Sequence, residues 1–355
     1  MEKDTITLTV NGKQVQGKQG QTVLEICRDN DIHIPTLCYH PKMPPYGGCR
    51  LCIVEIEKMR GLPPSCTTPA ADGMVVATRS DELKRVRKTV LELLLSYGNH
   101  NCLLCEESGN CELQALVYEH GIEDVRYKSK YVPPPKDDSN AMIVRDQSKC
   151  VLCGRCVRAC LDVQVNGVID VAKRGSDSYI STFNSMPLGD SNCLFCGECV
   201  SVCPTGALTE KQARFLGRPW EIKKVETTCT YCGVGCQLEL NVKDGKVVKV
   251  SSSDKIAGPN NGSLCVKGRF GYDFIHHPDR LTTPLIKEGG TFKEASWDEA
   301  LSLIAKRFGT IKADSGPDSF AFFTSARCSN EDNYLMNKFA RAAIGTNNID
   351  HCARL

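Results

Sequence analysis

The sequence predicts a multidomain α+β protein, built from small cysteine-rich modules and ending in the start of an α/β domain. The chain has 355 residues, more than a single hydrophobic core usually holds. Its 22 cysteines fall mostly into short-spaced groups whose style changes along the chain. Strand-like alternation near the N-terminus gives way to alternating strand and helix patterns after residue 281. Each cysteine group therefore marks a separate module.

The charge balance excludes some classes of partner. Lys plus Arg is 44 and Asp plus Glu is 42, so the formal net charge of +2 lacks the basic excess typical of proteins that bind nucleic acid or anionic membranes. Residues 1–10 have no signal-peptide core, and no run approaches the roughly 18 apolar residues of a membrane span. We therefore expect a soluble cytoplasmic protein whose reduced thiols hold metal.

The first module, residues 1–80, combines a hairpin with four cysteines. Asn11-Gly12 supplies a two-residue turn, and Thr22 with Glu25 forms a capping box before a helix. The cysteine spacing is C-x10-C-x2-C-x13-C, and Gly47-Gly48 lets the backbone pass close to the ligands. The expected ligands are Cys38, Cys49, Cys52 and Cys66. Four thiolates beside a small sheet suit a [2Fe-2S] cluster, and zinc is the alternative that the spacing leaves open.

The second module, residues 81–130, opens with apolar residues at helical spacing over Asp81–Tyr97. Three cysteines follow, and three thiolates need a fourth ligand. The three are Cys102, Cys105 and Cys111. His100 is the nearest candidate, because a neutral imidazole can complete such a shell. The alternative is a solvated loop histidine, with the fourth ligand elsewhere or absent. Three consecutive prolines within residues 131–140 then predict a stiff, extended linker.

The third module, residues 141–218, carries the most specific pattern. The spacing C-x2-C-x2-C-x3-C occurs twice, as in bacterial two-cluster ferredoxins, where the fourth cysteine of each run binds the other cluster. One [4Fe-4S] cluster would use Cys150, Cys153, Cys156 and Cys203, and the other would use Cys193, Cys196, Cys199 and Cys160. The crossing holds the two clusters close enough for electrons to pass between them.

The fourth module, residues 222–280, has three closely spaced cysteines and a distant fourth. Asp244-Gly245 predicts a hairpin between two alternating segments. The expected ligands are Cys229, Cys232, Cys236 and Cys265, which suit another [4Fe-4S] cluster, with zinc again as the alternative. Three cysteines lie outside all of these sets, and we expect Cys27, Cys328 and Cys352 to be packed thiols.

Residues 281–355 change to a strand and helix pattern. An amphipathic helix begins at Trp297, Ser319–Thr324 reads as a buried strand, and a second helix extends to Ala343. This alternation indicates the start of an α/β domain. About 75 residues supply only part of such a domain, so we expect the chain to be truncated.

The motifs resemble those of known iron-sulfur enzymes. The first module resembles the β-grasp [2Fe-2S] domain at the head of respiratory complex I large subunits, iron-only hydrogenases and cytoplasmic formate dehydrogenases. In these families a histidine four residues before the second module's first cysteine is a ligand, and Gly98 stands at that position here. The fourth module, CxxCxxxC with a distant Cys-Val-Lys, resembles the [4Fe-4S] domain of molybdenum or tungsten bis-pterin enzymes. That resemblance implies that Lys267 lies between this cluster and a pterin.

The C-terminal segment SARCSNEDNYLMNKFARAAIGTNNIDHCARL resembles formate dehydrogenase catalytic subunits. The resemblance implies that a metal-ligating selenocysteine or cysteine follows Leu355, and we expect a recoded UGA codon there. The whole chain then resembles the N-terminal part of the catalytic subunit of a cytoplasmic, NAD(P)-linked or ferredoxin-linked formate dehydrogenase that also reduces carbon dioxide. The implied cofactors are one [2Fe-2S] cluster, four [4Fe-4S] clusters and, in the full-length subunit, a molybdenum or tungsten bis-pterin guanine dinucleotide.

The resemblance also implies an electron path and its partners. Electrons would run from the pterin past Lys267 to the Cys229 cluster, through the ferredoxin clusters, and out by the Cys102 and Cys38 clusters. The expected partner is a flavin-containing NAD(P)H dehydrogenase subunit, with a ferredoxin or a hydrogenase module as alternatives. No G-x-G-x-x-G follows a strand, so any NAD(P) would bind another chain. The rival interpretations are an electron-transfer subunit of a hydrogenase or complex I-like NAD(P)H-linked oxidoreductase, and an inactive fragment.

Overall fold

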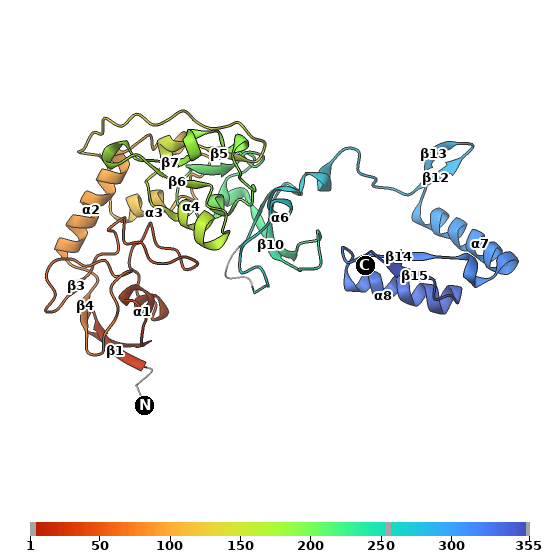
Figure 1. Ribbon diagram of the computed structural model, residues 1–355, viewed down its shortest axis with the longest axis horizontal. Helices are drawn as coiled ribbons and strands as arrows, with labels where there is room; N and C mark the ends of the chain where they lie inside the picture. The colour runs from red at the N-terminus through yellow and green to blue at the C-terminus, as the bar shows by residue number, and fades with distance from the viewer. Residues whose placement is uncertain (1–4, 253–256, 353–355) are drawn as a thin grey trace. The chain divides into compact units, whose positions relative to one another are not determined.

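The computed structural model describes residues 5–252 and 257–352, and the chain divides into two compact units, Met1–Lys223 and Lys224–Leu355. Figure 1 shows the order of the elements within each unit. The boundary follows directly after the third predicted module, residues 141–218. The first unit therefore contains the first three cysteine modules, and the second unit contains the fourth module and the C-terminal segment.

A four-stranded sheet with the order β2-β1-β4-β3 begins the first unit. Its strands are β1 (Thr5–Val10), β2 (Lys13–Lys18), β3 (Glu55–Ile56) and β4 (Val75–Ala77). Strand β1 pairs antiparallel with β2 and parallel with β4. The predicted hairpin is confirmed, since Asn11 and Gly12 have positive φ angles of 51° and 80°. Helix α1 (Val23–Asp29) begins at the predicted Thr22–Glu25 capping box, and its buried side chains join the core of this sheet.

Helix α2 (Asp81–Ser96), predicted from its apolar spacing, connects the sheet to the second module. Arg87, in the middle of α2, is buried and donates hydrogen bonds to three backbone carbonyls of the first module, those of Leu51, Ile53 and Thr78. A short 3-10 turn, Cys102–Leu104, and helix α3 (Glu112–Glu119) follow. Leucines of α2 and α3 share one core with leucines of the first module. The first two modules are thus packed together.

The predicted linker, residues 131–140, is fully described and contains no helix or strand, yet it is held in place. Its Asp137 exchanges two backbone hydrogen bonds with Arg145 and forms an ion pair with the same residue at 3.2 Å. The ring of Tyr131 stacks on that of Tyr97, with 4.1 Å between centroids. The linker is therefore held against other residues of the first unit.

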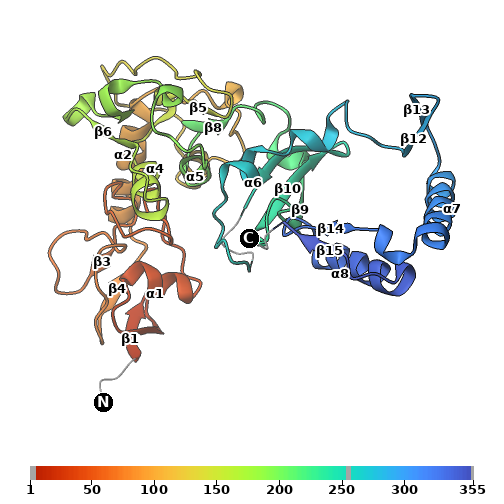
Figure 2. The same ribbon diagram turned by 45° about the vertical axis from the view of Figure 1, so that its right-hand side comes forward.

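Two small antiparallel ladders and two short helices form the third module. Strand β5 (Ile143–Arg145) pairs with β8 (Leu208–Glu210), and β6 (Ile169–Ala172) pairs with β7 (Tyr179–Thr182). Helices α4 (Arg155–Arg158) and α5 (Glu198–Ser201) lie side by side (Figure 2). A π-helical turn, Ala159–Val163, continues α4, and 3-10 turns occupy Gln147–Lys149, Gly175–Asp177, Phe183–Ser185 and Leu188–Asp190. A further 3-10 turn, Pro219–Glu221, follows the module. The sequence repeat is also a structural repeat, because each short helix follows a left-handed glycine, Gly154 (φ 69°) or Gly197 (φ 72°).

The second unit begins with a three-stranded sheet in the order β11-β10-β9. Its strands are β9 (Lys223–Thr228), β10 (Gln237–Lys243) and β11 (Lys246–Ser251). The predicted hairpin is confirmed, with positive φ angles of 50° at Asp244 and 76° at Gly245. Helix α6 (Val266–Phe270) and the 3-10 turn Asp273–His276 follow, and Tyr272 between them packs with Leu238 of β10 and Val250 of β11.

The C-terminal segment contains the predicted alternation of strands and helices. It comprises the hairpin of β12 (Leu285–Glu288) and β13 (Thr291–Glu294), then α7 (Trp297–Ser315), β14 (Phe322–Thr324), α8 (Asn330–Lys338), the π-helical turn Phe339–Ile344 and β15 (Ile349–His351). Strands β14 and β15 pair in parallel through a helical crossover. The predicted buried strand Ser319–Thr324 is wrong in two respects: Pro317–Ser319 is a 3-10 turn, and Phe323 is exposed because neighbouring strand residues point to opposite faces.

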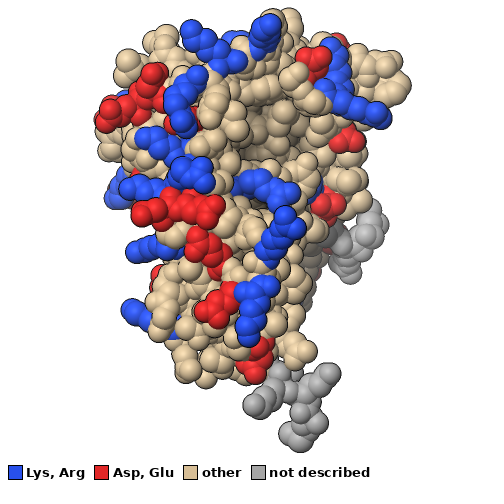
Figure 3. Space-filling model, turned by 90° about the vertical axis from the view of Figure 1, so that its left-hand side faces the viewer, with Lys and Arg blue, Asp and Glu red and all other residues tan. Residues whose placement is uncertain are grey.

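The surface carries charges of both signs. On the face shown in Figure 3, Lys and Arg side chains are interspersed with Asp and Glu side chains. Within residues 5–252 and 257–352, no helix combines the length and the apolar character needed to cross a bilayer.

Candidate metal centres

The four cysteines of the first module come together as two contacting pairs. The thiols of Cys38 and Cys49 hydrogen-bond each other, and so do those of Cys52 and Cys66. The hydrogen bond with Cys49 lowers the pKa of Cys38 to about 5, and the one with Cys66 lowers the pKa of Cys52 to about 7. A [2Fe-2S] cluster is held by four thiolates, two on each iron, so this arrangement in pairs fits it.

The loop that carries these cysteines needs its glycines. Gly47 has a φ of +67°, and a Cβ atom on Gly48 would lie less than 3.0 Å from the ring of Tyr46. The close contacts at Gly47 and Gly48 are with Thr67 and Tyr46, so the predicted close passage beside the cysteine ligands stays a prediction. The amide of Cys49 then donates to the sulfur of Cys38 over 3.4 Å, as it would to a ligand thiolate.

Two arginines from other modules support this loop, and neither was predicted from the sequence. Arg87 of α2 donates to the carbonyls of Leu51 and Ile53, on either side of Cys52, at 3.1 and 2.7 Å. Arg158 of α4 donates to the carbonyl of Cys38 at 2.5 Å and also to that of Pro44 at 2.7 Å. Only the position of Arg158, between two cysteines of the ferredoxin repeat, is a signal visible in the sequence.

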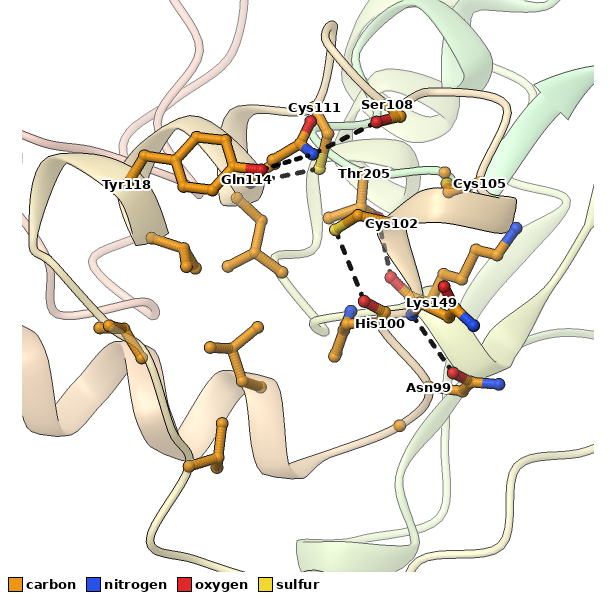
Figure 4. A pocket seen from close by; sticks show the side chains of 18 of the residues that line it. Asn99, His100, Cys102, Cys105, Ser108, Cys111, Gln114, Tyr118, Lys149 and Thr205 are labelled. Carbon is orange, nitrogen blue, oxygen red and sulfur yellow. Dashed lines mark hydrogen bonds between the residues drawn. The ribbon is translucent and has the colours of Figure 1, made fainter.

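The three cysteines of the second module line a cavity of about 490 Å³ together with His100 (Figure 4). The sulfur of Cys111 accepts from the amide of Gln114 and contacts the carbonyl oxygen of Pro204, each at 3.5 Å. Burial raises the pKa of Cys111 to about 11. A buried thiol of this kind becomes a thiolate only when a metal replaces its proton.

His100 presents an unused nitrogen in this region. Its Nε2 atom is buried and has no hydrogen-bond partner. Burial lowers the pKa of the ring, which favours the neutral imidazole that binds metals. The structure therefore brings His100 to the same cavity as the three thiols, and its role as the fourth ligand stays a prediction.

The third module brings its eight cysteines together in a crossed pattern. The thiol of Cys203 interacts electrostatically with those of Cys150 and Cys153, from the other motif. In return, the thiol of Cys160 interacts with those of Cys193 and Cys199. Burial raises the pKa of Cys150 and Cys153 to about 12. Cys199 also interacts with Cys156 and Cys203 of the first set, so the crossed membership of the two sets stays a prediction.

The fourth module gathers its cysteines beside β10 and α6. Burial raises the pKa of Cys236, and the thiols of Cys229, Cys232 and Cys265 raise it further. The amide of Cys229 donates to the carbonyl of Cys236 at 2.8 Å. Lys267 follows Cys265 in the first turn of α6 and is exposed.

The three remaining cysteines differ from one another. Cys27 is fully buried in the core of the first module, which confirms the prediction of a packed thiol. For Cys328 and Cys352 the same prediction is wrong, because both are exposed on irregular segments that cover no core. The sulfur of Cys352 instead lies 3.3 Å from the hydroxyl of Ser325.

The spacing of the thiols bears on zinc. Over the described ranges, no three His, Cys, Asp or Glu side chains are grouped as ligands of one metal ion would be. Zinc draws four ligands to about 2.3 Å from a single point, whereas a cluster with several irons separates its thiolates.

Five family descriptions match consecutive parts of the chain. They are the 2Fe-2S iron-sulfur cluster binding domain (residues 3–81), the NADH-ubiquinone oxidoreductase-G iron-sulfur binding region (87–126), the 4Fe-4S dicluster domain (149–207), the Molybdopterin oxidoreductase Fe4S4 domain (222–277) and Molybdopterin oxidoreductase (280–355). The expected [2Fe-2S], [4Fe-4S] and molybdopterin oxidoreductase domains are thus confirmed, and the matches favour iron over zinc.

The names of similar proteins refer to different electron donors and acceptors. The alpha subunit of an NADPH-Fe(3+) oxidoreductase from Geobacter sulfurreducens is 39% identical over 99% of this chain and 40% of its own length. A Staphylococcus aureus protein named "Putative formate dehydrogenase" is 34% identical over 99% of this chain and 39% of its own. The chain thus spans about two fifths of these relatives. In a crystal structure of an NAD+-reducing [NiFe]-hydrogenase, one chain is 38% identical, with a TM-score of 0.57 over 60% of this chain and 90% of that one.

Proposed function

Because the chain joins [2Fe-2S] and [4Fe-4S] cluster domains to a molybdopterin oxidoreductase domain, we propose that it is the electron-transfer portion of the catalytic subunit of a formate dehydrogenase that also reduces carbon dioxide. The observation that carries the choice of formate is the segment Ser325–Leu355, whose wording resembles formate dehydrogenase catalytic subunits. The similarity to the Staphylococcus aureus protein over almost the whole chain supports the same choice.

Each thiol set would hold one centre. Cys38, Cys49, Cys52 and Cys66 would hold a [2Fe-2S] cluster, and four [4Fe-4S] clusters would be held by His100 with Cys102, Cys105 and Cys111, by the two crossed ferredoxin sets, and by Cys229, Cys232, Cys236 and Cys265. When bound, such clusters carry single electrons, here between a molybdenum or tungsten bis-pterin guanine dinucleotide in the full-length subunit and a redox partner. Lys267 would lie between the last of these cysteine sets and the pterin.

The side chains of this chain do three things for the centres. Partial burial shields several of the thiols from water, as the raised pKa values of Cys111, Cys150 and Cys153 reflect. Arg87 and Arg158 hold the carbonyls of the loop that carries Cys38 and Cys52. The contact between Cys111 and the carbonyl of Pro204, directly after Cys203, brings the second module's thiols next to the ferredoxin sets. These contacts support a continuous electron path through the first unit.

The partner we propose is a flavin-containing NAD(P)H dehydrogenase subunit in the cytoplasm. Two relatives carry NADPH or NAD+ in their names, which supports a nicotinamide-linked acceptor on another chain. A ferredoxin and a hydrogenase module are the alternatives.

The test is cluster reduction by different donors. The protein is purified anaerobically with its bound subunits and mixed with formate, NADPH, NADH or hydrogen, and electron paramagnetic resonance records which donor reduces the clusters. Formate should reduce both types of cluster, so that the signals of reduced [2Fe-2S] and reduced [4Fe-4S] clusters both appear. Reduced clusters with every donor except formate would refute the choice of formate and leave the electron-transfer role intact.

A second candidate function rests on the hydrogenase structure. Its chain matches over 90% of its length at 38% identity, which favours an electron-transfer subunit of a hydrogenase or of a complex I-like NAD(P)H-linked oxidoreductase. Reduction by hydrogen in the same experiment, with formate inactive, would select this function.

A further inference from the structure

The ferredoxin repeat carries opposite charges at equivalent positions. Cys153-Gly154-Arg155-Cys156 in the first motif corresponds to Cys196-Gly197-Glu198-Cys199 in the second. Arg155 and Glu198 each begin the short helix after the left-handed glycine, so the backbone places them alike. The two equivalent positions of the repeat thus carry opposite charges. Glu107 also acts on Cys203 of the first set, and Arg145 acts on Cys193 of the second.

Both charges are buried. The side chain of Arg155 is 4% exposed and that of Glu198 is 1% exposed. Arg155 interacts electrostatically with the thiols of Cys153 and Cys203, both from the first set. Glu198 lies in sequence between Cys196 and Cys199, both from the second set. A buried charge acts on its neighbours through a lower dielectric than an exposed one.

Each buried charge is paired with a residue of another module. Arg155 forms a two-pronged ion pair with Glu112, at 2.5 and 2.8 Å, and the Glu112 side chain is 46% exposed. Glu198 lies 3.5 Å from the ammonium of Lys42, which is 12% exposed. Glu112 is far more exposed than Arg155, so solvent screens it more, whereas Lys42 is only slightly more exposed than Glu198.

We propose that Arg155 and Glu198 set the reduction potentials of the two ferredoxin-type clusters apart, so that the Cys150-Cys153-Cys156-Cys203 cluster is reduced more easily than its neighbour. Each cluster gains one electron on reduction, and a nearby cation stabilises that added negative charge while a nearby anion opposes it. Potentials of such clusters respond to net charge and exposure around them. Electrons would then collect on the cluster whose Cys203 is followed by Pro204, the residue in contact with Cys111.

The repeat shows a second asymmetry of the same sign. Arg158 in α4 corresponds to Ser201 in α5, so the first helix carries two cations where the second carries one anion. Arg158 is directed to the carbonyl of Cys38, however, and is held there. Arg155 is therefore the residue whose charge is specific to the first ferredoxin set.

The experiment is a redox titration of the full chain, purified anaerobically with its clusters, followed by electron paramagnetic resonance. Cys153→Ser and Cys196→Ser, each of which alters one cluster, assign the signals. Arg155→Gln should lower the midpoint of the Cys150 cluster, and Glu198→Gln should raise that of the other. We expect each midpoint potential to shift by about 59 mV. At a fixed potential, this corresponds to an about tenfold change in the ratio of reduced to oxidised cluster for one electron. Arg155→Lys and Glu198→Asp keep the charges and should shift much less.

A second pair of variants leaves the buried residues intact. Glu112→Gln removes the exposed partner of Arg155 and should raise the first midpoint, while Lys42→Met should lower the second. Unchanged midpoints in the Gln variants of residues 155 and 198, or shifts of the same sign in both, would overturn the proposal.

The proposal rests on the proposed function only in requiring [4Fe-4S] clusters at these two sets. Absent [4Fe-4S] signals in the unmodified chain would therefore remove both, whereas intact signals without any response to formate would leave this inference standing.

Discussion

The carbonyl oxygen of Ser148 lies so close to the Cα of Gly98 that a Cβ atom on residue 98 would come within 3.0 Å of it. The same oxygen accepts a hydrogen bond of 2.7 Å from the amide of Asn99, so it cannot move away without loss. Gly98 also has a φ of +131°, which other residues rarely adopt. A histidine at this position, as the resembling families have, does not fit this backbone. The ring of His100 occupies the vacant space, with Nε2 3.7 Å from where that Cβ would be.

Gly98→Ala should destabilise the first unit. The substitution adds both backbone strain and a collision with Ser148, whereas Gly73→Ala, at φ +76° with no atom within 4 Å, adds strain alone. We expect Gly98→Ala to cost about 2 kcal/mol more than Gly73→Ala, the typical size of an overpacking penalty. Thermal unfolding of both variants measures the difference, and equal midpoints would contradict the collision.

His100→Ala should remove one [4Fe-4S] centre or convert it to a different cluster. Among the residues that the structure describes, the substitution deletes the only imidazole lining the cavity of Cys102, Cys105 and Cys111. Iron content together with electron paramagnetic resonance of the reduced protein measures the loss. His33→Ala is the matched control, because that imidazole is exposed and faces Glu119. His100→Cys should retain a cluster with an altered signal. Identical spectra for His100→Ala and the unmodified chain would rule out His100 as a ligand.

Arg87→Met should destabilise the first two modules and loosen the loop around Cys52. The change leaves three carbonyls, those of Leu51, Ile53 and Thr78, without their buried donor. Breaking a buried charged network in this way costs about 3–5 kcal/mol. Arg85→Met, on the exposed side of the same helix, removes only a surface pair with Glu82 and should cost less than about 1 kcal/mol. Denaturation and the rate of [2Fe-2S] loss to a chelator measure the two effects, and similar losses in both variants would contradict the assignment.

Cys352 should react with an alkylating reagent at a lower pH than the same thiol does in a Ser325→Ala variant. The hydrogen bond with Ser325 lowers the pKa of Cys352, so its reactive thiolate persists to lower pH. Removing that hydroxyl should raise the pKa and move the rate profile to higher pH. Mass spectrometry after iodoacetamide treatment follows the reaction, with the clusters kept loaded to protect the ligand thiols. A profile that does not move in Ser325→Ala would exclude this hydrogen bond as the cause.

Contiguous patterns predicted the modules well. Both hairpins were predicted because their turn residues, such as Asn11 and Gly12, adopt positive φ at low cost whatever surrounds them. The helix Asp81–Ser96 followed from its apolar spacing, and the capping box at Thr22 and Glu25 from four consecutive residues. Cysteine spacing predicted the two-cluster ferredoxin domain, and spacing together with the family resemblance predicted the [2Fe-2S] domain; the family matches confirm both.

What sequence decided by itself was therefore the local chemistry: where each thiol group lies, which turns and helices carry it, and that the repeat in the third module has opposite charges. Only the tertiary structure decided which distant groups meet. Arg158 reaches the carbonyl of Cys38 across 120 positions of sequence, and Ser148 lies against Gly98 although no local rule connects them. The physical reason is that spacing rules act through bonds within a few residues, whereas close packing between modules depends on how whole surfaces fit.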